Sequence, residues 1–513
     1  MFSFIIKKKQ ENMLIKEAQD RLFGQEEKVE SILNKLQNLS ESDFYPYHMP
    51  GHKRLGNDIF ALDITEIDGF DNLHHATGIL KEAQERAANL YGALDSYFLV
   101  NGSTCGILAA VSAAFHRGDR VIVARNCHKA VYHALELRGL EPVYLYPEQI
   151  AEYDINNRIR PVQVAELLER EDKKAAGMIL TSPTYEGYAS EIGEIAKILH
   201  ERDMILIVDE AHGAHFGFHE DFPKSAVGQG ADLVIQSLHK TLPSMTQTAL
   251  LHRCGSRVEK ERIQKFLGVY QTSSPSYVFM AYMDECMRLL EREGHELFAE
   301  FSLKLRDFYK KCDSLRHIQI VRDYRSDKVL ADPGKVVIGA GEFMTGKELY
   351  DKLRCEFGLQ LEMYAGNYAL AIMTVCDSRE GFDRLYEALC KIDRDLEETG
   401  ACTPHKRYER SADTDKVREA LALLYRKQPT IKYLSGEVED LEREKVDLED
   451  CANRISGEYI YLYPPGIPFI VPGECVDEEM LKAMISLRNQ GYEVQGMADT
   501  EGASLWVVKE NDR

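Results

Sequence analysis

The sequence predicts an α/β protein with a doubly wound, mostly parallel sheet in a large domain. Two observations support this fold class. Short apolar runs alternate with helical patterns from residue 96 to about 250, and a polar cluster follows each run. Because ligands of doubly wound sheets bind beyond the carboxyl ends of the strands, we expect these clusters to share one edge. The strand-like runs are 96–100, 120–124, 177–180, 204–208 and 231–235.

The length and composition indicate a multidomain globular protein. The 513 residues predict two to four domains, and 44% hydrophobic with 29% charged residues is ordinary globular composition. A formal net charge of −21 argues against nucleic acid or an anionic membrane surface as a partner. Eleven cysteines without a Cys-x-x-Cys pair indicate reduced thiols and no zinc site. No long apolar segment is present, so we expect a cytoplasmic protein whose start is Met1 or Met13.

Helical and strand patterns outside the sheet indicate further units. A helical arm is expected over 13–39, a helix over 79–91 that ends at Gly92, and a long amphipathic helix from Tyr277 into the 300s. A smaller α/β unit with strands at 335–338 and 369–373 follows, and a charged loop-like stretch precedes the last part. The predicted domains are an arm (1–45), a large domain (46–300), a small α/β domain (301–400) and a C-terminal domain (401–513).

Asp209 and Lys240 are the residues that we expect to carry chemistry. Each follows an apolar run, and one strand–helix unit separates them. Most lysines are solvated surface charges, so the position at a strand end is what marks Lys240. A lysine there can hold the aldehyde of pyridoxal phosphate as a Schiff base, and an aspartate can keep the ring nitrogen protonated. The pair therefore predicts a pyridoxal phosphate site.

A Gly-Ser-Thr turn at 101–106 precedes a helical pattern and includes Ser103 and Thr104. Such a turn offers backbone N–H groups and hydroxyls to an anion, although many turns of this kind only cap a helix. His128 likewise lies between a strand-like run, 120–124, and a helical pattern. We therefore expect a phosphate group near the first turn.

Two histidine-rich segments lie before the sheet. The loop 45–53 combines His52 with a Pro-Gly turn and is interpreted as either a surface turn or the rim of an active site. His74 and His75 are adjacent, but no third ligand stands at helical spacing, so no metal is expected.

The motifs together resemble the bacterial-type ornithine, lysine and arginine decarboxylases that depend on pyridoxal phosphate and have fold type I. The resemblance covers about 45–475. It is carried by the segments 50–53, 101–106, 126–129, 183–187, 209–213, 237–240, 271–272 and 463–468. It implies a fold-type-I transferase-like large domain, a smaller α/β domain and a C-terminal α+β domain.

The resemblance also implies roles for individual residues. Lys240 would bind the cofactor and transfer protons, Asp209 would pair with the ring nitrogen, and His128 would stack on the ring. His212 would lie near the ring oxygen or the substrate carboxylate. The phosphate would be held by Ser103, Thr104, Ser237 and His239, and by Thr272 reaching from a partner subunit.

The implied reaction is decarboxylation of a basic amino acid, with arginine favoured, giving agmatine, over lysine and ornithine. Longer members carry an amino-terminal domain that resembles a response regulator, and only about 45 residues precede the first motif here. We therefore expect a homodimer or a dimer of dimers rather than a large ring. An aminotransferase or lyase on the same scaffold, or an inactive relative that binds cofactor or a partner, are the alternatives.

The residue that meets the distal cation of the substrate is expected to be an acid, because an unpaired cation in a closed site is costly. Glu458 is the candidate because it precedes the Tyr- and Pro-rich block, with Asp68 and Asp71 in reserve. The alternative is that Glu458 is a solvated charge at a strand edge or part of a structural ion pair. The residue before it, Gly457, stands where the family commonly has a small residue other than glycine, so the sequence departs from the family pattern at this point. His52 and Tyr185 are also expected near the substrate.

Overall fold

The computed structural model describes residues 30–509 apart from 151–152, 154, 322–329, 342, 399–415, 418 and 463–465. Three predicted parts extend outside the described residues. They are residues 13–29 of the predicted arm, residues 399–415 of the charged stretch before the last domain, and residues 463–465 of the Tyr- and Pro-rich block. Within the described ranges, no helix combines the length and apolar character needed to span a bilayer.

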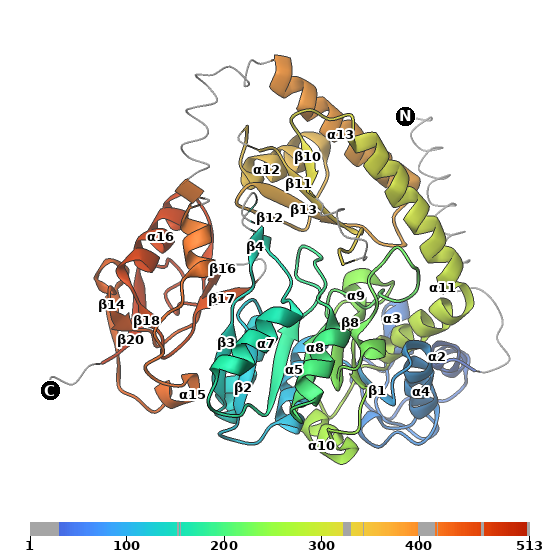
Figure 1. Cartoon of the computed structure of the whole chain (residues 1–513). Helices are drawn as coiled ribbons and strands as arrows, with labels where there is room; N and C mark the ends of the chain where they lie inside the picture. Colours follow the sequence, from blue (N-terminus) through green and yellow to red (C-terminus); the bar gives the residue numbers. More distant parts are fainter. Residues whose placement is uncertain are drawn as a thin grey trace.

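The predicted α/β class is confirmed by a central seven-stranded sheet with the order β1-β9-β8-β7-β6-β2-β3 (Figure 1). Neighbours from β3 to β8 are parallel, whereas β9 is antiparallel to both β8 and β1. The strands are β1 (Asp95–Leu99), β2 (Arg120–Ala124), β3 (Glu141–Leu145), β6 (Gly177–Thr181), β7 (Ile205–Asp209), β8 (Leu233–Ser237) and β9 (Ala249–Arg253). All strands except β9 therefore point their carboxyl ends to one edge.

Helices flank this sheet. They are α5 (Gly102–Ala114), α6 (Lys129–Arg138), α7 (Pro161–Arg170), α8 (Ile192–His200), α9 (Leu238–Thr241) and α10 (Lys260–Tyr270). Of these, α5, α6, α8 and α9 follow strands that the sequence predicts. β8 is buried at all five positions, as expected for a central strand covered on both faces. Sequence reasoning missed β3 and β9, because Glu141 and the pair His252–Arg253 interrupt their apolar patterns.

The predicted helix over 79–91 is confirmed as α4 (Ile79–Tyr91), which ends at Gly92 in the left-handed conformation that glycine favours. The predicted long helix is α11 (Tyr277–Cys312), and it packs against both α4 and α13 (Arg379–Glu398). The predicted domain limit at residue 300 falls inside α11, so this helix belongs to both units. The domain boundaries predicted from the sequence therefore remain a proposal.

A second sheet forms the smaller unit beside α11 (Figure 1). Its strands have the order β10-β11-β13-β12 and are all antiparallel to their neighbours. They are β10 (Gln319–Val321), β11 (Lys335–Gly339), β12 (Met363–Ala365) and β13 (Tyr368–Ile372), with α12 (Gly346–Phe357) and α13 alongside. The two strands predicted in this unit are thus β11 and β13.

The carboxyl-terminal part forms small sheets around α16 (Glu478–Asn489). Its strands are β14 (Arg443–Asp447), β15 (Arg454–Ile455), β16 (Ile460–Leu462), β17 (Ile467–Ile470), β18 (Cys475–Val476), β19 (Val494–Gln495) and β20 (Ser504–Val508). Shorter elements elsewhere are α2 (Ile32–Glu41), α3 (Asp58–Leu62), α15 (Ser435–Val438), β4 (Gln149–Ile150) and β5 (Ile155–Asn156).

A buried ion pair joins the carboxyl-terminal unit to the central sheet. Arg125, directly after β2, donates from Nη2 to Glu474 at 2.9 Å and to the carbonyl of Phe469 at 3.1 Å. Both charged side chains are almost fully buried, and the guanidinium lies over the ring of Tyr144. Burial without a partner would be costly for either charge, so each residue depends on the other.

We predict that Glu474→Ala lowers the free energy of unfolding by about 3–5 kcal/mol, because it leaves the Arg125 charge buried and unpaired. Glu478→Ala is the matched control, since Glu478 pairs with Lys482 on the surface and such pairs contribute about 0–1 kcal/mol. Urea denaturation of both variants measures the difference. Equal stability of the two variants would contradict the structural role of the pair.

Candidate active site

Asp209 and Lys240 lie at the carboxyl ends of two neighbouring parallel strands. Asp209 is the last residue of β7, and Lys240 lies in α9, which begins directly after β8. Burial raises the pKa of Asp209, and the nearby Lys240 opposes this shift. Burial also lowers the pKa of Lys240, while Asp209 and then Glu362 raise it. The predicted carboxylate and lysine therefore share one dry environment, in which each influences the charge of the other.

His212 lies between two lysines. Its Nε2 is 3.1 Å from Nζ of Lys240, and its Nδ1 is 2.7 Å from Nζ of Lys335, the first residue of β11. The ring of Tyr185 stands 4.4 Å from the imidazole, measured between centroids. Burial, then Lys240 and Lys335, lower the pKa of His212 well below its usual value, so this imidazole is neutral.

His128 caps the amino end of α6, where its Nδ1 accepts a hydrogen bond from the Ala130 N–H at 3.2 Å. Burial, followed by the charge of Lys240, lowers the pKa of His128 to about 3. The ring is therefore neutral at physiological pH and lies within the electrostatic range of Lys240. A neutral ring in this place is suited to stacking on an aromatic cofactor.

Hydroxyls and a helix amino terminus meet beside these residues. The Oγ atoms of Ser103, in the first turn of α5, and of Ser237, at the end of β8, are 2.9 Å apart. Thr104 is exposed in the same turn. Nδ1 of His239 binds the carbonyl of Thr248 at 3.0 Å, which orients the ring at the start of α9.

The loop that holds Thr272 lies beside the turn that opens α5, within the same protomer. The Thr272 N–H donates to Oδ1 of Asn101 at 3.1 Å, and its carbonyl lies 2.9 Å from Nε2 of His74. Asn101 is the residue immediately before α5. The expectation that Thr272 reaches the phosphate of a partner subunit stays a prediction.

This set of side chains fits pyridoxal phosphate. A helix amino terminus with two facing hydroxyls is suited to a phosphate. A cationic ring nitrogen would relieve the cost of burying the Asp209 carboxylate, and Lys240 is placed to hold the aldehyde.

Other predicted substrate residues do not gather here. The carboxylate of Glu458 accepts from the N–H groups of Ala498 at 2.7 Å and Trp506 at 2.9 Å, so it stabilises the carboxyl-terminal unit. This placement favours a structural role for Glu458 over contact with the substrate. Nε2 of His52 lies 3.2 Å from Asp63, and the His52 ring stacks on Phe60.

The acidic loop offers no better candidate. The carboxylate of Asp71 accepts from the N–H groups of Asn72, Thr77, Gly78 and Leu80, and so serves the start of α4. Burial alone would raise the pKa of Asp71, but these backbone donors outweigh it and lower the pKa. Asp68 is exposed.

Glu362 and Lys335 are site residues that sequence reasoning missed. The exposed carboxylate of Glu362 accepts a hydrogen bond from the Tyr185 hydroxyl, and its charge raises the pKa of both Lys240 and Lys335. Both residues come from the smaller unit, more than 90 positions after Lys240 in the chain. Neither stands in a motif, so the sequence carried no signal for them.

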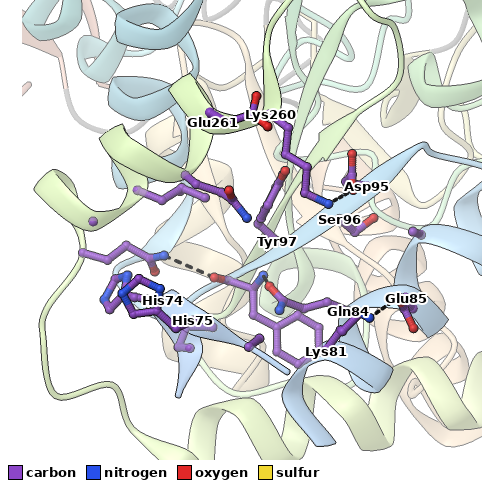
Figure 2. Close-up of a pocket in the computed structure, with 18 of the residues that line it drawn as sticks. His74, His75, Lys81, Gln84, Glu85, Asp95, Ser96, Tyr97, Lys260 and Glu261 are labelled. Carbon is purple, nitrogen blue, oxygen red and sulfur yellow. Dashed lines mark hydrogen bonds and ion pairs between the residues drawn. The ribbon is translucent and has the colours of Figure 1, made fainter. Parts of the chain in front are cut away.

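A separate cavity of about 650 Å³ runs along the outer strand β1 (Figure 2). His74 and His75 lie at one end of it, and Lys260 pairs with Asp95 at the other. Gln271 lines it as well. Among the described side chains, no group of three or more His, Cys, Asp or Glu residues is placed to bind a metal ion.

Comparisons with known proteins agree with this geometry. The sequence profile described as "Orn/Lys/Arg decarboxylase, major domain" matches residues 35–346, and the profile of the C-terminal domain of the same family matches residues 423–504. Two Bacillus subtilis relatives are similar over most of the chain. The uncharacterized protein YaaO is 33% identical (91% of this chain, 96% of the relative), and an arginine decarboxylase is 31% identical (90% and 94%).

Solved structures support the fold. The Francisella novicida lysine decarboxylase LdcF superposes with a TM-score of 0.79 at 19% identity, covering 93% of this chain and 81% of the other. Lysine decarboxylase A from Pseudomonas aeruginosa gives 0.78 at 20% identity, covering 98% and 82%. Since the major-domain profile matches more than half of the chain, the protein belongs to the Orn/Lys/Arg decarboxylase family of pyridoxal-phosphate-dependent carboxy-lyases.

Proposed function

We propose that this protein decarboxylates a basic L-amino acid, with arginine as the first candidate and agmatine as its product. The observation that carries the proposal is the placement of the buried Asp209 and of Lys240 after the neighbouring strands β7 and β8, where each shifts the pKa of the other. Four arginine decarboxylases are 29–31% identical to this chain over most of its length, and one from Escherichia coli is 26% identical over 47% of it, whereas two lysine decarboxylases are 23–24% identical. This difference favours arginine over lysine.

The residues divide the work of this reaction. Pyridoxal phosphate, when bound, supplies the electron sink that stabilises the negative charge left by departing CO₂. Asp209 would keep the ring nitrogen protonated, and His128 would cover one face of the ring. Ser103, Ser237 and the amino end of α5 would hold the phosphate. Lys240 would hold the aldehyde and carry at Nζ the proton that replaces CO₂ at the α-carbon.

Glu362 is our candidate for the residue that binds the distal cation of the substrate. It influences the charge of Lys240, it is exposed, and the hydroxyl of Tyr185 orients its carboxylate. An amino acid held near Lys240 projects its cation several carbons away, where an unpaired charge would be costly. A planar guanidinium can bind a carboxylate through two parallel hydrogen bonds, which agrees with arginine as the first candidate.

A homodimer is our proposal for the assembly, either alone or as a dimer of dimers. Large apolar side chains are exposed along one segment near the amino end, and α3 within it buries none of its residues. Several large apolar side chains exposed within residues 44–59 indicate a protein partner. A second copy of this chain as that partner fits the resemblance. The exposed side chains are Phe44, Tyr45, Tyr47, Met49, Leu55 and Ile59.

The proposed reaction is tested by offering arginine, lysine and ornithine separately and identifying the products. We expect CO₂ and the corresponding amine, with agmatine formed fastest. Lys240→Ala is expected to lose nearly all turnover, because no other lysine holds its place at the end of β8. A keto acid in place of the amine would support an aminotransferase, and bound cofactor without turnover would support an inactive relative.

The role of Glu362 predicts that Glu362→Gln raises KM for the basic substrate about 10-fold or more, since a hydrogen bond to a charged partner contributes about 1.5–3 kcal/mol. The absorbance of the bound cofactor should stay unchanged. Glu458→Gln is the matched control and should leave KM near the wild-type value. A rise in KM for Glu458→Gln alone would return the role to Glu458.

The proposed dimer predicts that Leu55→Asp shifts the protein toward the monomer in analytical ultracentrifugation, because a charge would be buried at the interface. Leu303→Asp is the control, since Leu303 is a similarly exposed leucine on α11. Identical sedimentation of Leu55→Asp and the wild type, both as dimers, would remove this surface from the interface.

A further inference from the structure

A smaller cavity lies where three parts of the chain meet (Figure 1). One wall comes from β12 and β13 of the smaller unit, another from the β4–β5 hairpin, and a third from the carboxyl-terminal unit. Its volume is about 200 Å³. Pockets for drug-sized molecules measure roughly 300–1,000 Å³, so this cavity suits a smaller ligand.

Glu186 brings a carboxyl group to this cavity. The hydroxyl of Tyr368 donates to its Oε1 at 2.7 Å. Within the described part of the chain, no lysine, arginine or histidine forms an ion pair with this carboxylate, and Nζ of the nearby Lys335 contacts His212 instead. Burial raises the pKa of Glu186. Its negative charge is therefore costly as the structure stands, and a cation bound in the cavity would relieve that cost.

Tyrosine rings line the cavity around this carboxyl group. Tyr153, Tyr368 and Tyr425 come from the β4–β5 hairpin, from β13 and from the helical segment 419–426. The faces of tyrosine rings attract cations, most strongly where water is excluded. Tyr364 also lines the cavity, but Nζ of Lys347 already lies 5.8 Å from the centre of its ring. Three aromatic rings and a carboxyl group together are suited to an organic cation.

Glu493 brings a second carboxyl group to the same cavity. It is exposed, so it marks the side that opens to solvent. The residues that line the cavity are all among those that the structure describes, and they include no lysine, arginine or histidine. A ligand that carries a carboxylate would find no positive side chain here. The cavity therefore favours a compound with two cationic ends over an amino acid.

Contacts between the units hold the walls of the cavity in place. Arg426, from the carboxyl-terminal unit, donates from Nε to Oε1 of Gln149 at 3.0 Å. Nε2 of Gln149 in turn donates to Oδ1 of Asn156, which lines the cavity, at 3.4 Å. The hydroxyl of Tyr153 donates to Gln319 in β10. The cavity is thus formed by the packing of the units, as is usual for sites that bind small molecules.

The cavity borders the active site at two points of the backbone. Glu186 follows Tyr185, whose hydroxyl donates to the carboxylate of Glu362. Met363, which lines the cavity, directly follows Glu362. A ligand in the cavity would therefore contact the chain neighbours of both residues that we expect near the substrate. It would occupy a separate site, because neither Tyr185 nor Glu362 lines the cavity.

We propose that this cavity binds a small aliphatic dication, with one cationic end at Glu186 among the tyrosines and the other directed toward Glu493. Agmatine, which has an amine at one end and a guanidinium at the other, is the first candidate. Only this choice of ligand rests on the proposed function, because agmatine is the product expected from arginine. The enzyme would thus hold its product at a second site, next to the one where it is formed.

The proposal is tested by isothermal titration calorimetry of the full chain with agmatine. Borohydride treatment beforehand reduces any Schiff base, so that the amine cannot react with a bound cofactor. We expect saturable binding, and we expect Glu186→Gln to raise the Kd about tenfold or more, because a hydrogen bond between charged groups is lost. Glutamine keeps an oxygen that can accept from Tyr368, so the wall of the cavity is preserved.

Two control variants distinguish this cavity from other acidic sites. Glu356→Gln removes a carboxylate that pairs with Lys352 on the surface of the same unit, and it should leave the Kd unchanged. Glu362→Gln changes the proposed substrate contact and should leave the binding that depends on Glu186 in place. Loss of binding in Glu362→Gln but not in Glu186→Gln would place agmatine in the active site and overturn the proposal.

A series of ligands tests the preference for a dication. At the site that depends on Glu186, arginine should bind about tenfold more weakly than agmatine, because its carboxylate has no positive partner there. Equal affinity for arginine would contradict the proposal. 1,4-Diaminobutane and 1,5-diaminopentane are the dications that ornithine and lysine would yield. Tightest binding by either of these would support the site and identify that amine as its ligand.

A further measurement needs no variant. Crystals of the wild-type protein soaked with agmatine should show it between Glu186 and the rings of Tyr368 and Tyr425. Agmatine found only beside Lys240, or absent from the crystals, would refute the proposal. Calorimetry and diffraction both report binding rather than turnover, so their outcome stands even if the amine assay rejects the proposed reaction.

Discussion

The burial of two opposite charges at neighbouring strand ends is the constraint on which the site depends. Parallel strands bring Asp209 and Lys240 to one edge, where burial raises the pKa of Asp209 and lowers that of Lys240. In that environment each group shifts toward its neutral form, so the site has little tolerance for an unpaired charge. The neutral His128 and His212, and the acids around Lys335, follow from the same condition.

The carboxyl-terminal unit reaches the site through the turn that carries His128. Arg125 lies three residues before His128 and forms the buried pair with Glu474. The N–H of Lys129, directly after His128, donates to the carbonyl of Gly466 at 3.2 Å, and its Nζ contacts the hydroxyl of Tyr461. This unit therefore holds the turn that carries His128, the residue that we propose covers the cofactor ring.

Local sequence patterns predicted the parts of the site that lie on one strand–helix unit each. Asp209, Ser237 and Lys240 follow buried strands directly, so short windows were sufficient to place them. Lys335 and Glu362 could not be found in this way, because only the packing of the smaller unit brings them near Lys240. Glu458 illustrates a different difficulty: it stands close in sequence to a motif, but its carboxylate accepts hydrogen bonds from the backbone of its own unit, which favours the structural alternative.

The outer strand β1 has a further consequence for the behaviour of the protein at high concentration. Side-chain amides occupy outward-facing peptide groups at its carboxyl end: Gln84 accepts from the Phe98 N–H at 3.0 Å, and Gln271 donates to the carbonyl of Phe98 and accepts from the N–H of Val100. An exposed strand edge is a template for joining sheets of different molecules, and these two glutamines close it. The carboxyl end of this edge is thereby protected against the addition of a strand from another molecule.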